Sequence, residues 1–151
     1  GLLPEQVQGF GLGVMAARAR WCAQEDGIDF ANGRVYGPHG SGLVVANGPT
    51  AYDEAVSARL TERTVHANLE VRALGFKPYL APALSSAAVS ILSLVRGQPY
   101  YAALPLGGVW LGAQRRMTTL GPLQRREPLH PALLARIEAA RLELEAFCHD
   151  A

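Results

Sequence analysis

The sequence predicts an α+β fold in which long helices pack on an antiparallel β-hairpin and a three-stranded antiparallel meander. Long segments with helix-like spacing of apolar residues and clear end signals occupy both halves of the chain. Two short apolar runs flank a glycine-rich turn at 37–42, and three more runs separated by glycine-proline turns follow residue 99. With 151 residues, 49% of them hydrophobic and 18% charged, we expect a single domain over 1–151.

The first predicted helix runs from Pro4 to Gln24. Glycines at 9, 11 and 13 each weaken it by about 1 kcal/mol relative to alanine, so its regular part is expected to start late. The predicted buried stripe consists of Val14, Ala17, Trp21 and Cys22.

Arg18 shares the apolar face of this helix, because it lies four residues after Val14 and four before Cys22. A buried guanidinium rarely lacks an anionic partner. Arg18 therefore either pairs with an internal acid such as Asp26 or Asp29, or binds a ligand.

A histidine lies in the glycine-rich turn between the first two predicted strands, 35–36 and 43–46. Asn32-Gly33 is a turn signal before this hairpin, and Asn47-Gly48-Pro49 ends it. The glycines around His39 let the backbone approach a ligand closely, and an imidazole can exchange a proton near neutral pH. His39 is thus a candidate for proton transfer. The alternative is a turn histidine without a chemical role.

Two further helices are predicted in the middle of the chain. Thr50 and Asp53 form a capping-box-like start to a helix over Ala51–Leu74, and Gly75 ends it. The next helix, Pro82–Arg96, has no charged face within it, so we expect it to be covered on all sides as the central core helix.

The last part of the chain predicts a meander and an amphipathic helix. Its strands are expected at Tyr100–Leu104, Val109–Met117 and Leu123–Arg126, with arginine pairs at 115–116 and 125–126 that form a candidate basic patch. Pro131 opens the final helix. Its apolar stripe is Leu133, Ile137, Ala140 and Leu144, opposite Glu138, Arg141, Glu143 and Glu145.

Charge and cysteine content restrict the class of protein. A net charge of +1 gives no general attraction to nucleic acid or an anionic membrane, and no apolar run reaches the length of a membrane span. Cys22 and Cys148 form no metal-type spacing, and no metal site is expected. We expect a reduced, cytoplasmic protein.

The order of these elements and three motifs resemble the C-terminal, substrate-binding domain of the lactate/malate dehydrogenase family. The segment from Pro4 to Gly11, followed by Ala17-Arg18-Ala19-Arg20, resembles the family's entry into its substrate helix. Gly37-Pro38-His39-Gly40-Ser41 resembles its Gly-Glu-His-Gly-Asp catalytic loop, and Val109-Trp110-Leu111-Gly112 is similar to a strand of its meander. The region 129–147 corresponds to its terminal helix.

The resemblance implies a site for a 2-hydroxy or 2-oxo carboxylic acid. Arg18 matches the arginine that grips the substrate carboxylate, for which a flat, two-pronged donor is suited. His39 matches the histidine that gives a proton to the carbonyl oxygen while a nicotinamide cofactor, NAD, supplies the hydride.

The sequence departs from the family in three places. Met15 stands where the family has the aspartate that orients the histidine, and a thioether cannot replace that charge. Pro38 and Ser41 or Gly42 replace acidic neighbours of the histidine, and the family's small polar residue before the apolar helix is replaced near Phe76-Lys77-Pro78. Within these 151 residues no Gly-x-Gly-x-x-Gly follows a strand, so an NAD-binding domain is expected upstream.

Two functions follow from these observations. The first is the substrate-binding domain of a lactate/malate dehydrogenase-like oxidoreductase, impaired or inactive as this chain alone and combined with an NAD-binding domain. The second is a non-catalytic carboxylate-binding or oligomerisation module derived from that family. A homo-oligomer is expected under either function, because the apolar helix from Ala83 needs more cover than a small domain supplies.

Overall fold

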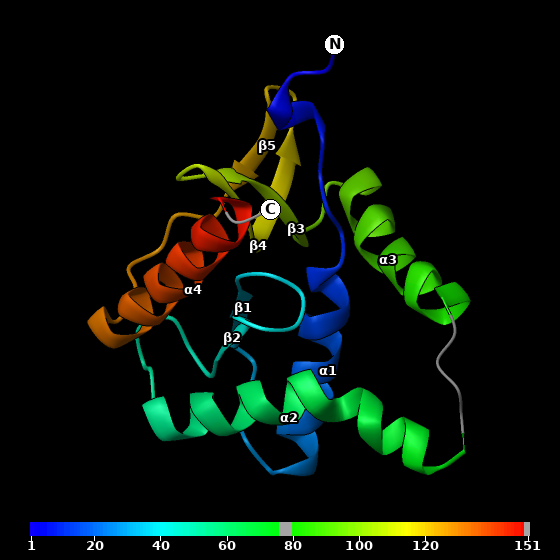
Figure 1. Ribbon diagram of the computed structural model, residues 1–151, viewed down its shortest axis with the longest axis vertical. Coiled ribbons are helices and arrows are strands. Elements are labelled where there is room, and N and C mark those ends of the chain that lie inside the picture. The colour runs from blue at the N-terminus through cyan, green and yellow to red at the C-terminus, as the bar shows by residue number, and fades with distance from the viewer. Residues whose placement is uncertain (76–79, 150–151) are drawn as a thin grey trace.

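The computed structural model describes residues 1–75 and 80–149 and confirms the α+β fold class. Helices flank a central hairpin and a three-stranded sheet (Figure 1). The elements, in chain order, are η1 (Pro4–Gln6), α1 (Leu12–Glu25), β1 (Arg34–Tyr36), β2 (Val44–Ala46), α2 (Glu54–Ala73), α3 (Leu80–Val95), β3 (Tyr100–Leu106), β4 (Val109–Thr118), β5 (Gly121–Gln124) and α4 (Pro131–His149). Segment 76–79, which includes the replaced polar position near Phe76-Lys77-Pro78, lies outside the described residues.

The hairpin of β1 and β2 lies between two parts of the core. Its strands are antiparallel, with Val35 opposite Val45 and Tyr36 opposite Val44. Because side chains alternate along a strand, Val35 and Val45 pack with α1 and α2, whereas Tyr36 and Val44 pack with β4 and α4. Both faces of this short hairpin are therefore buried, which fixes the loop at its tip relative to both halves of the molecule.

The second sheet is the predicted meander, with strand order β3-β4-β5 and antiparallel pairing throughout. The third strand begins and ends two residues before the predicted range of 123–126, because Gly121, at a φ of 111°, already pairs with Thr118. Two isolated bridges add to this sheet: Gly9 pairs with Ala103, and Gly37 pairs with Gly112. The second bridge ties the histidine loop to the sheet.

Helix α1 starts late, as expected, but its predicted apolar stripe is wrong in part. Trp21 is 43% exposed and Ala17 is also exposed. The face turned to the hairpin and α2 is instead made of Leu12, Met15, Ala16, Ala19, Cys22 and Ala23. Small residues on this face let the helix approach the hairpin closely, which leaves the large Trp21 side chain at the edge of the contact.

Helix α2 starts later than predicted, and its N-cap is Asp53 rather than a box that begins at Thr50. The Asp53 carboxylate accepts a hydrogen bond of 2.9 Å from the Val56 N–H, as an N-cap does. The helix begins at Glu54, because the Asp53 N–H donates to Asn47 Oδ1 and residues 47–52 form a loop before it.

The prediction that α3 is the central core helix is wrong. Val89 and Val95 are 70% and 73% exposed, and Ile91 and Leu92 are also exposed. Figure 1 shows α3 at one side of the molecule, and within its described side chains Ser90 is the buried contact with α1.

No helix in the described part of the chain has the length and apolar character needed to cross a bilayer.

Candidate functional site

The histidine loop owes its shape to three glycines with left-handed backbone conformations. Gly37, Gly40 and Gly42 have φ values of 90°, 105° and 78°. A Cβ at Gly37 would lie 2.7 Å from the carbonyl oxygen of Gly42, so the two ends of the loop approach more closely than any other residue allows. Gly37 also exchanges two backbone hydrogen bonds, of 3.0 and 3.1 Å, with Gly112.

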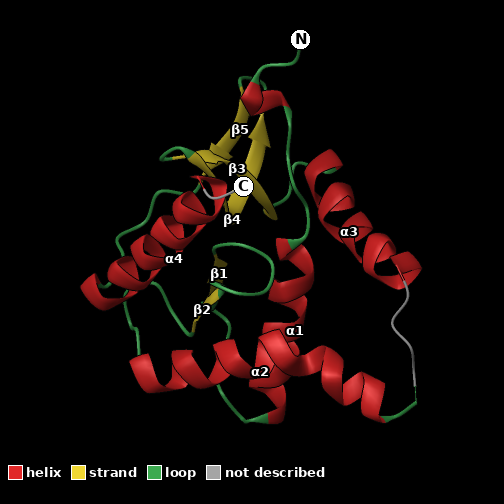
Figure 2. Ribbon diagram, viewed as in Figure 1, coloured by secondary structure: helices red, strands yellow, loops and turns green. Residues whose placement is uncertain are grey.

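His39 lies at the tip of this loop, beside the start of α1. A Cβ at Gly11 would lie 3.4 Å from His39 Cδ2 and 3.5 Å from His39 Cβ. The imidazole therefore packs on a glycine directly before the helix and remains exposed to solvent. Figure 2 shows the loop extending from β1 to the first turn of α1.

Arg18 lies on α1, seven residues after Gly11. Seven residues make about two helical turns, so Gly11 and Arg18 share one face of α1 and lie about 10 Å apart along its axis. The structure thus places His39 and Arg18 along the same helix face. That both act on one ligand stays a prediction.

Arg18 is half-buried and lines a cavity of about 230 Å³ together with Trp21, Ala67, Asn68 and Val71. His39 is not among the residues that line this cavity. Burial lowers the pKa of Arg18 because desolvation disfavours the charged form.

The internal acids considered as partners of Arg18 bind elsewhere. Asp26 forms ion pairs with Arg59 and Arg63, and Asp29 accepts a hydrogen bond from the Ala31 N–H. Within residues 1–75 and 80–149, no ion pair to Arg18 is found. The interpretation that Arg18 pairs with Asp26 or Asp29 is therefore wrong.

Met15 occupies the helix position between Gly11 and Arg18, one turn from each. It is 1% exposed and belongs to the core cluster of α1, the hairpin and α2. An apolar side chain at this position cannot accept a hydrogen bond from an imidazole N–H or stabilise its positive charge.

Sequence reasoning missed a polar cluster at the base of the hairpin. Arg34, whose side chain is 9% exposed, donates to Glu127 Oε1 at 3.1 Å, and Arg125 pairs with Glu127 Oε2 at 3.0 Å. No local sequence signal links Arg34 to Glu127, since the two lie 93 residues apart.

Two arginines of α4 were also missed. Arg136 donates to the hydroxyls of Tyr52, Ser57 and Thr61 at 2.8, 2.7 and 3.3 Å, and so connects α4 to α2 and the loop before it. Arg141 was expected on the solvent side, but its side chain is 20% exposed.

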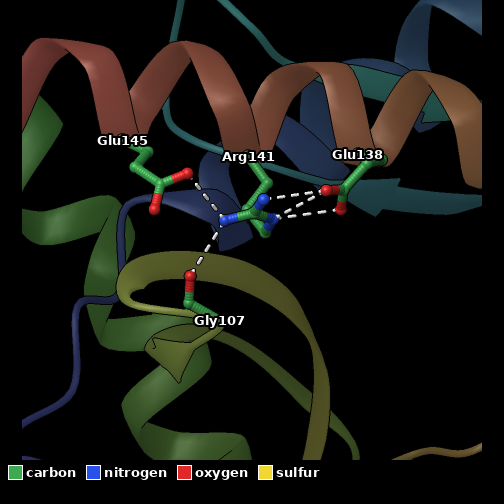
Figure 3. Close-up of polar contacts among 4 residues, drawn as sticks. All are labelled: Gly107, Glu138, Arg141 and Glu145. Atoms are coloured by element: carbon green, nitrogen blue, oxygen red, sulfur yellow. Dashed lines mark hydrogen bonds and ion pairs between the residues drawn. The ribbon is translucent and has the colours of Figure 1, made fainter.

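Figure 3 shows how Arg141 is held. It donates to Glu138, to Glu145 and to the carbonyl oxygen of Gly107 in the β3–β4 turn. The i, i+3 and i, i+4 spacings of the two glutamates could have been recognised in the sequence, whereas the bond to Gly107 could not.

The described residues contain no group of three or more histidine, cysteine, aspartate or glutamate side chains that could hold a metal ion. Both cysteines are free thiols, with Cys22 buried and Cys148 exposed.

Neither a protein-family model nor a curated protein sequence matches the chain. Solved structures do match its fold. Malate dehydrogenase from Archaeoglobus fulgidus, in a complex with NADH, has a TM-score of 0.75 at 17% identity, over 97% of this chain and 53% of that one. L-lactate dehydrogenase from Clostridium thermocellum has a TM-score of 0.73 at 15% identity, over 100% of this chain and 58% of its own. Malate dehydrogenase from Salinibacter ruber has a TM-score of 0.69 at 18% identity, over 99% of this chain and 56% of that one.

These similarities establish the fold: the chain has the architecture of the C-terminal domain of malate and lactate dehydrogenases. It spans little more than half the length of the dehydrogenases that it matches.

Proposed function

We propose that this chain is the substrate-binding part of a nicotinamide-dependent oxidoreductase that acts on a 2-hydroxy or 2-oxo carboxylic acid. The fold shared with malate and lactate dehydrogenases supports this function. NAD would be bound by a separate or upstream domain, and the chain alone would be impaired or inactive. A cytoplasmic location, with both thiols reduced, belongs to the same proposal.

The observation that carries the proposal is the placement of His39 and Arg18 relative to α1. His39 packs on Gly11, directly before α1, and Arg18 follows two turns later on the same face without an ion pair among the described residues. A half-buried guanidinium that has no carboxylate partner in the protein can pair with an anionic ligand instead.

In this function each side chain has a separate task. The Arg18 guanidinium donates two parallel hydrogen bonds to the substrate carboxylate and so fixes its orientation. During reduction the His39 imidazolium gives its proton to the carbonyl oxygen, and the imidazole is left neutral; oxidation reverses this transfer. The nicotinamide cofactor supplies or removes the hydride at the carbonyl carbon.

The test is binding of oxamate and pyruvate to the chain, followed by NMR of the His39 ring and by calorimetry. We expect saturable shifts of the His39 resonances, and Arg18→Lys should weaken binding by about tenfold, since a single ammonium cannot form the two-pronged contact. Arg20→Lys is the matched control, because Arg20 is exposed on another face of the helix. Absence of a saturable His39 response, or equal losses in the two variants, would reject the proposal.

Met15 favours a second candidate function, a carboxylate-binding or oligomerisation module without catalysis. Its buried apolar side chain leaves His39 without an orienting carboxylate from α1. The exposed apolar face of α3, with Val89, Leu92 and Val95, supports assembly as a homo-oligomer.

Sedimentation velocity of the Val89→Ser/Val95→Ser variant tests the assembly. Both side chains are exposed, so the monomer should keep its stability within about 0.5 kcal/mol, while the oligomer dissociates. A native chain that stays monomeric at every concentration would exclude self-assembly through this face.

A further inference from the structure

The meander carries a cavity bordered by cations, near the start of β3 and the end of β5. Its volume is about 260 Å³, and it is lined by Pro99, Gln114, Arg115, Arg116, Leu123 and Arg125. No acidic residue is among these lining residues. The carboxylate that pairs with one of these cations, Glu127 beside Arg125, lies outside the lining.

The register of the sheet brings Arg116 and Arg125 together. Leu123 lies opposite Arg116, and the Arg125 N–H bonds to the carbonyl oxygen of Gln114. Arg116 and Arg125 are therefore diagonal neighbours on one face of the sheet, about 7 Å apart at the backbone. Like charges at this separation repel, and an anion between them would remove the repulsion.

The terminal nitrogens of both arginines are available. Arg116 uses its Nε to donate to the carbonyl oxygen of Gly97, and Arg125 uses its Nε to contact Glu127. In the part of the chain that the structure describes, neither has a hydrogen bond from its Nη atoms. Each guanidinium is thus held in place by one nitrogen and can still offer the others to a ligand.

Arg115 adds a third positive charge on the other face of the strand. It is 4% exposed, and its hydrogen bonds go to the Ala102 and Leu111 carbonyls and to Gln124 Oε1, all of which are neutral. Desolvation lowers the pKa of Arg115. A buried guanidinium without a carboxylate raises the positive potential of the cavity beside it.

Glu127 does not neutralise this region, because Arg34 and Arg125 share its carboxylate. Four guanidiniums lie in this region, those of Arg34, Arg115, Arg116 and Arg125. Arg34 and Arg125 both pair with Glu127, whereas Arg115 and Arg116 have no ion pair within the described residues. Gln114 also lines the cavity, and its buried Oε1 has no partner there.

We propose that this cavity is a binding site for a small, doubly charged oxyanion of the phosphate-monoester class, held between Arg116 and Arg125. A tetrahedral group with three terminal oxygens and two negative charges can accept paired hydrogen bonds from two guanidiniums at once, whereas acetate offers two oxygens and a single charge to the same donors. The site is separate from Arg18 and His39 and does not depend on the proposed dehydrogenase function.

Binding of inorganic phosphate and phenyl phosphate to the 151-residue chain tests the site, by calorimetry and by the shift in melting temperature at constant ionic strength. We expect saturable binding of both, with chloride and acetate giving no saturable shift. Arg116→Gln and Arg125→Gln should each weaken binding by about tenfold, whereas Arg126→Gln, next in the chain and outside the cavity lining, should change it less than twofold. Arg18→Lys should also leave it unchanged, which separates this site from the proposed substrate site.

A second test adds a negative charge to the cavity and leaves all of its arginines in place. Leu123 is 59% exposed and lies opposite Arg116, so Leu123→Glu places a carboxylate where the anion would sit. We expect this variant to melt at a higher temperature than Leu123→Gln and to lose phosphate binding. Phosphate binding that survives Leu123→Glu, or that is equal in the three arginine-to-glutamine variants, would overturn the proposal, as would absence of saturable binding to the native chain.

Discussion

Helices α3 and α4 lie on opposite sides of the sheet and hairpin, and the sequence predicted the environment of α4 but not that of α3 (Figure 1). Helix α3 has no charged residue and was expected in the core, yet Val89 and Val95 are largely exposed. Helix α4 carries many charges, and it covers Tyr36 and Val44 with Leu133 and Ala140, two residues of its predicted apolar stripe.

The difference lies in how each helix is attached. Helix α4 is connected by arginines that reach neighbouring elements: Arg136 binds three hydroxyls and Arg141 binds the carbonyl of Gly107. The described contact of α3 with α1 is a close approach at Ser90 and Gly13. Apolar composition therefore indicates which surface can be buried, while contacts with neighbouring elements decide which surface this chain does bury.

The largest expected effect comes from the contact of α3 with α1. A Cβ at position 13 would lie 2.0 Å from Ser90 Oγ and 3.3 Å from Ser90 Cβ. Gly13→Val should therefore separate the two helices and lower the free energy of unfolding by about 2 kcal/mol, measured by urea denaturation. Ser90→Gly in the same background should recover part of the loss. If Gly13→Val lowers the free energy of unfolding equally with and without Ser90→Gly, contact with Ser90 is not the cause of the loss.

A smaller effect is expected from Arg136, which attaches α4. Arg136→Met keeps most of the aliphatic stem but leaves the hydroxyls of Tyr52, Ser57 and Thr61 without their guanidinium donor. The free energy of unfolding should fall by about 1–2 kcal/mol, because Ser57 is fully buried and loses a hydrogen bond. Arg126→Met is the matched control and should have almost no effect. If both variants unfold at the same urea concentration, Arg136 does not hold α4.

Much of the fold could be predicted because its signals are local. The turn glycines and the short apolar runs of the strands each depend on residues close in sequence. The same holds for the loop of His39, whose glycines at 37, 40 and 42 all adopt the left-handed conformation that glycine favours.

The remainder depends on contacts between distant residues. Neither the exposure of α3 nor the shared carboxylate of Arg34 and Arg125 has a signature within a short window. For the candidate site, the sequence predicts Arg18 and His39, and the structure adds that His39 packs on Gly11. That contact joins segments 28 residues apart, so no periodicity could show it.

The smallest effect is expected from Arg141, the second arginine of α4. Its hydrogen bond lowers the pKa of Glu138 below the ordinary 4.5, and the Glu138 side chain is exposed, so Arg141→Gln should change the melting temperature only slightly. Because the folded-state pKa of Glu138 is depressed, its contribution is present above pH 4.5 and is lost as the pH falls through the lower folded value. The difference in melting temperature between the native chain and Arg141→Gln should therefore shrink below pH 4.5, while Arg72→Gln in α2 serves as the control. A difference that persists unchanged in acid would mean that the bond to Gly107, and not the ion pair with Glu138, is what Arg141 contributes to the attachment of α4.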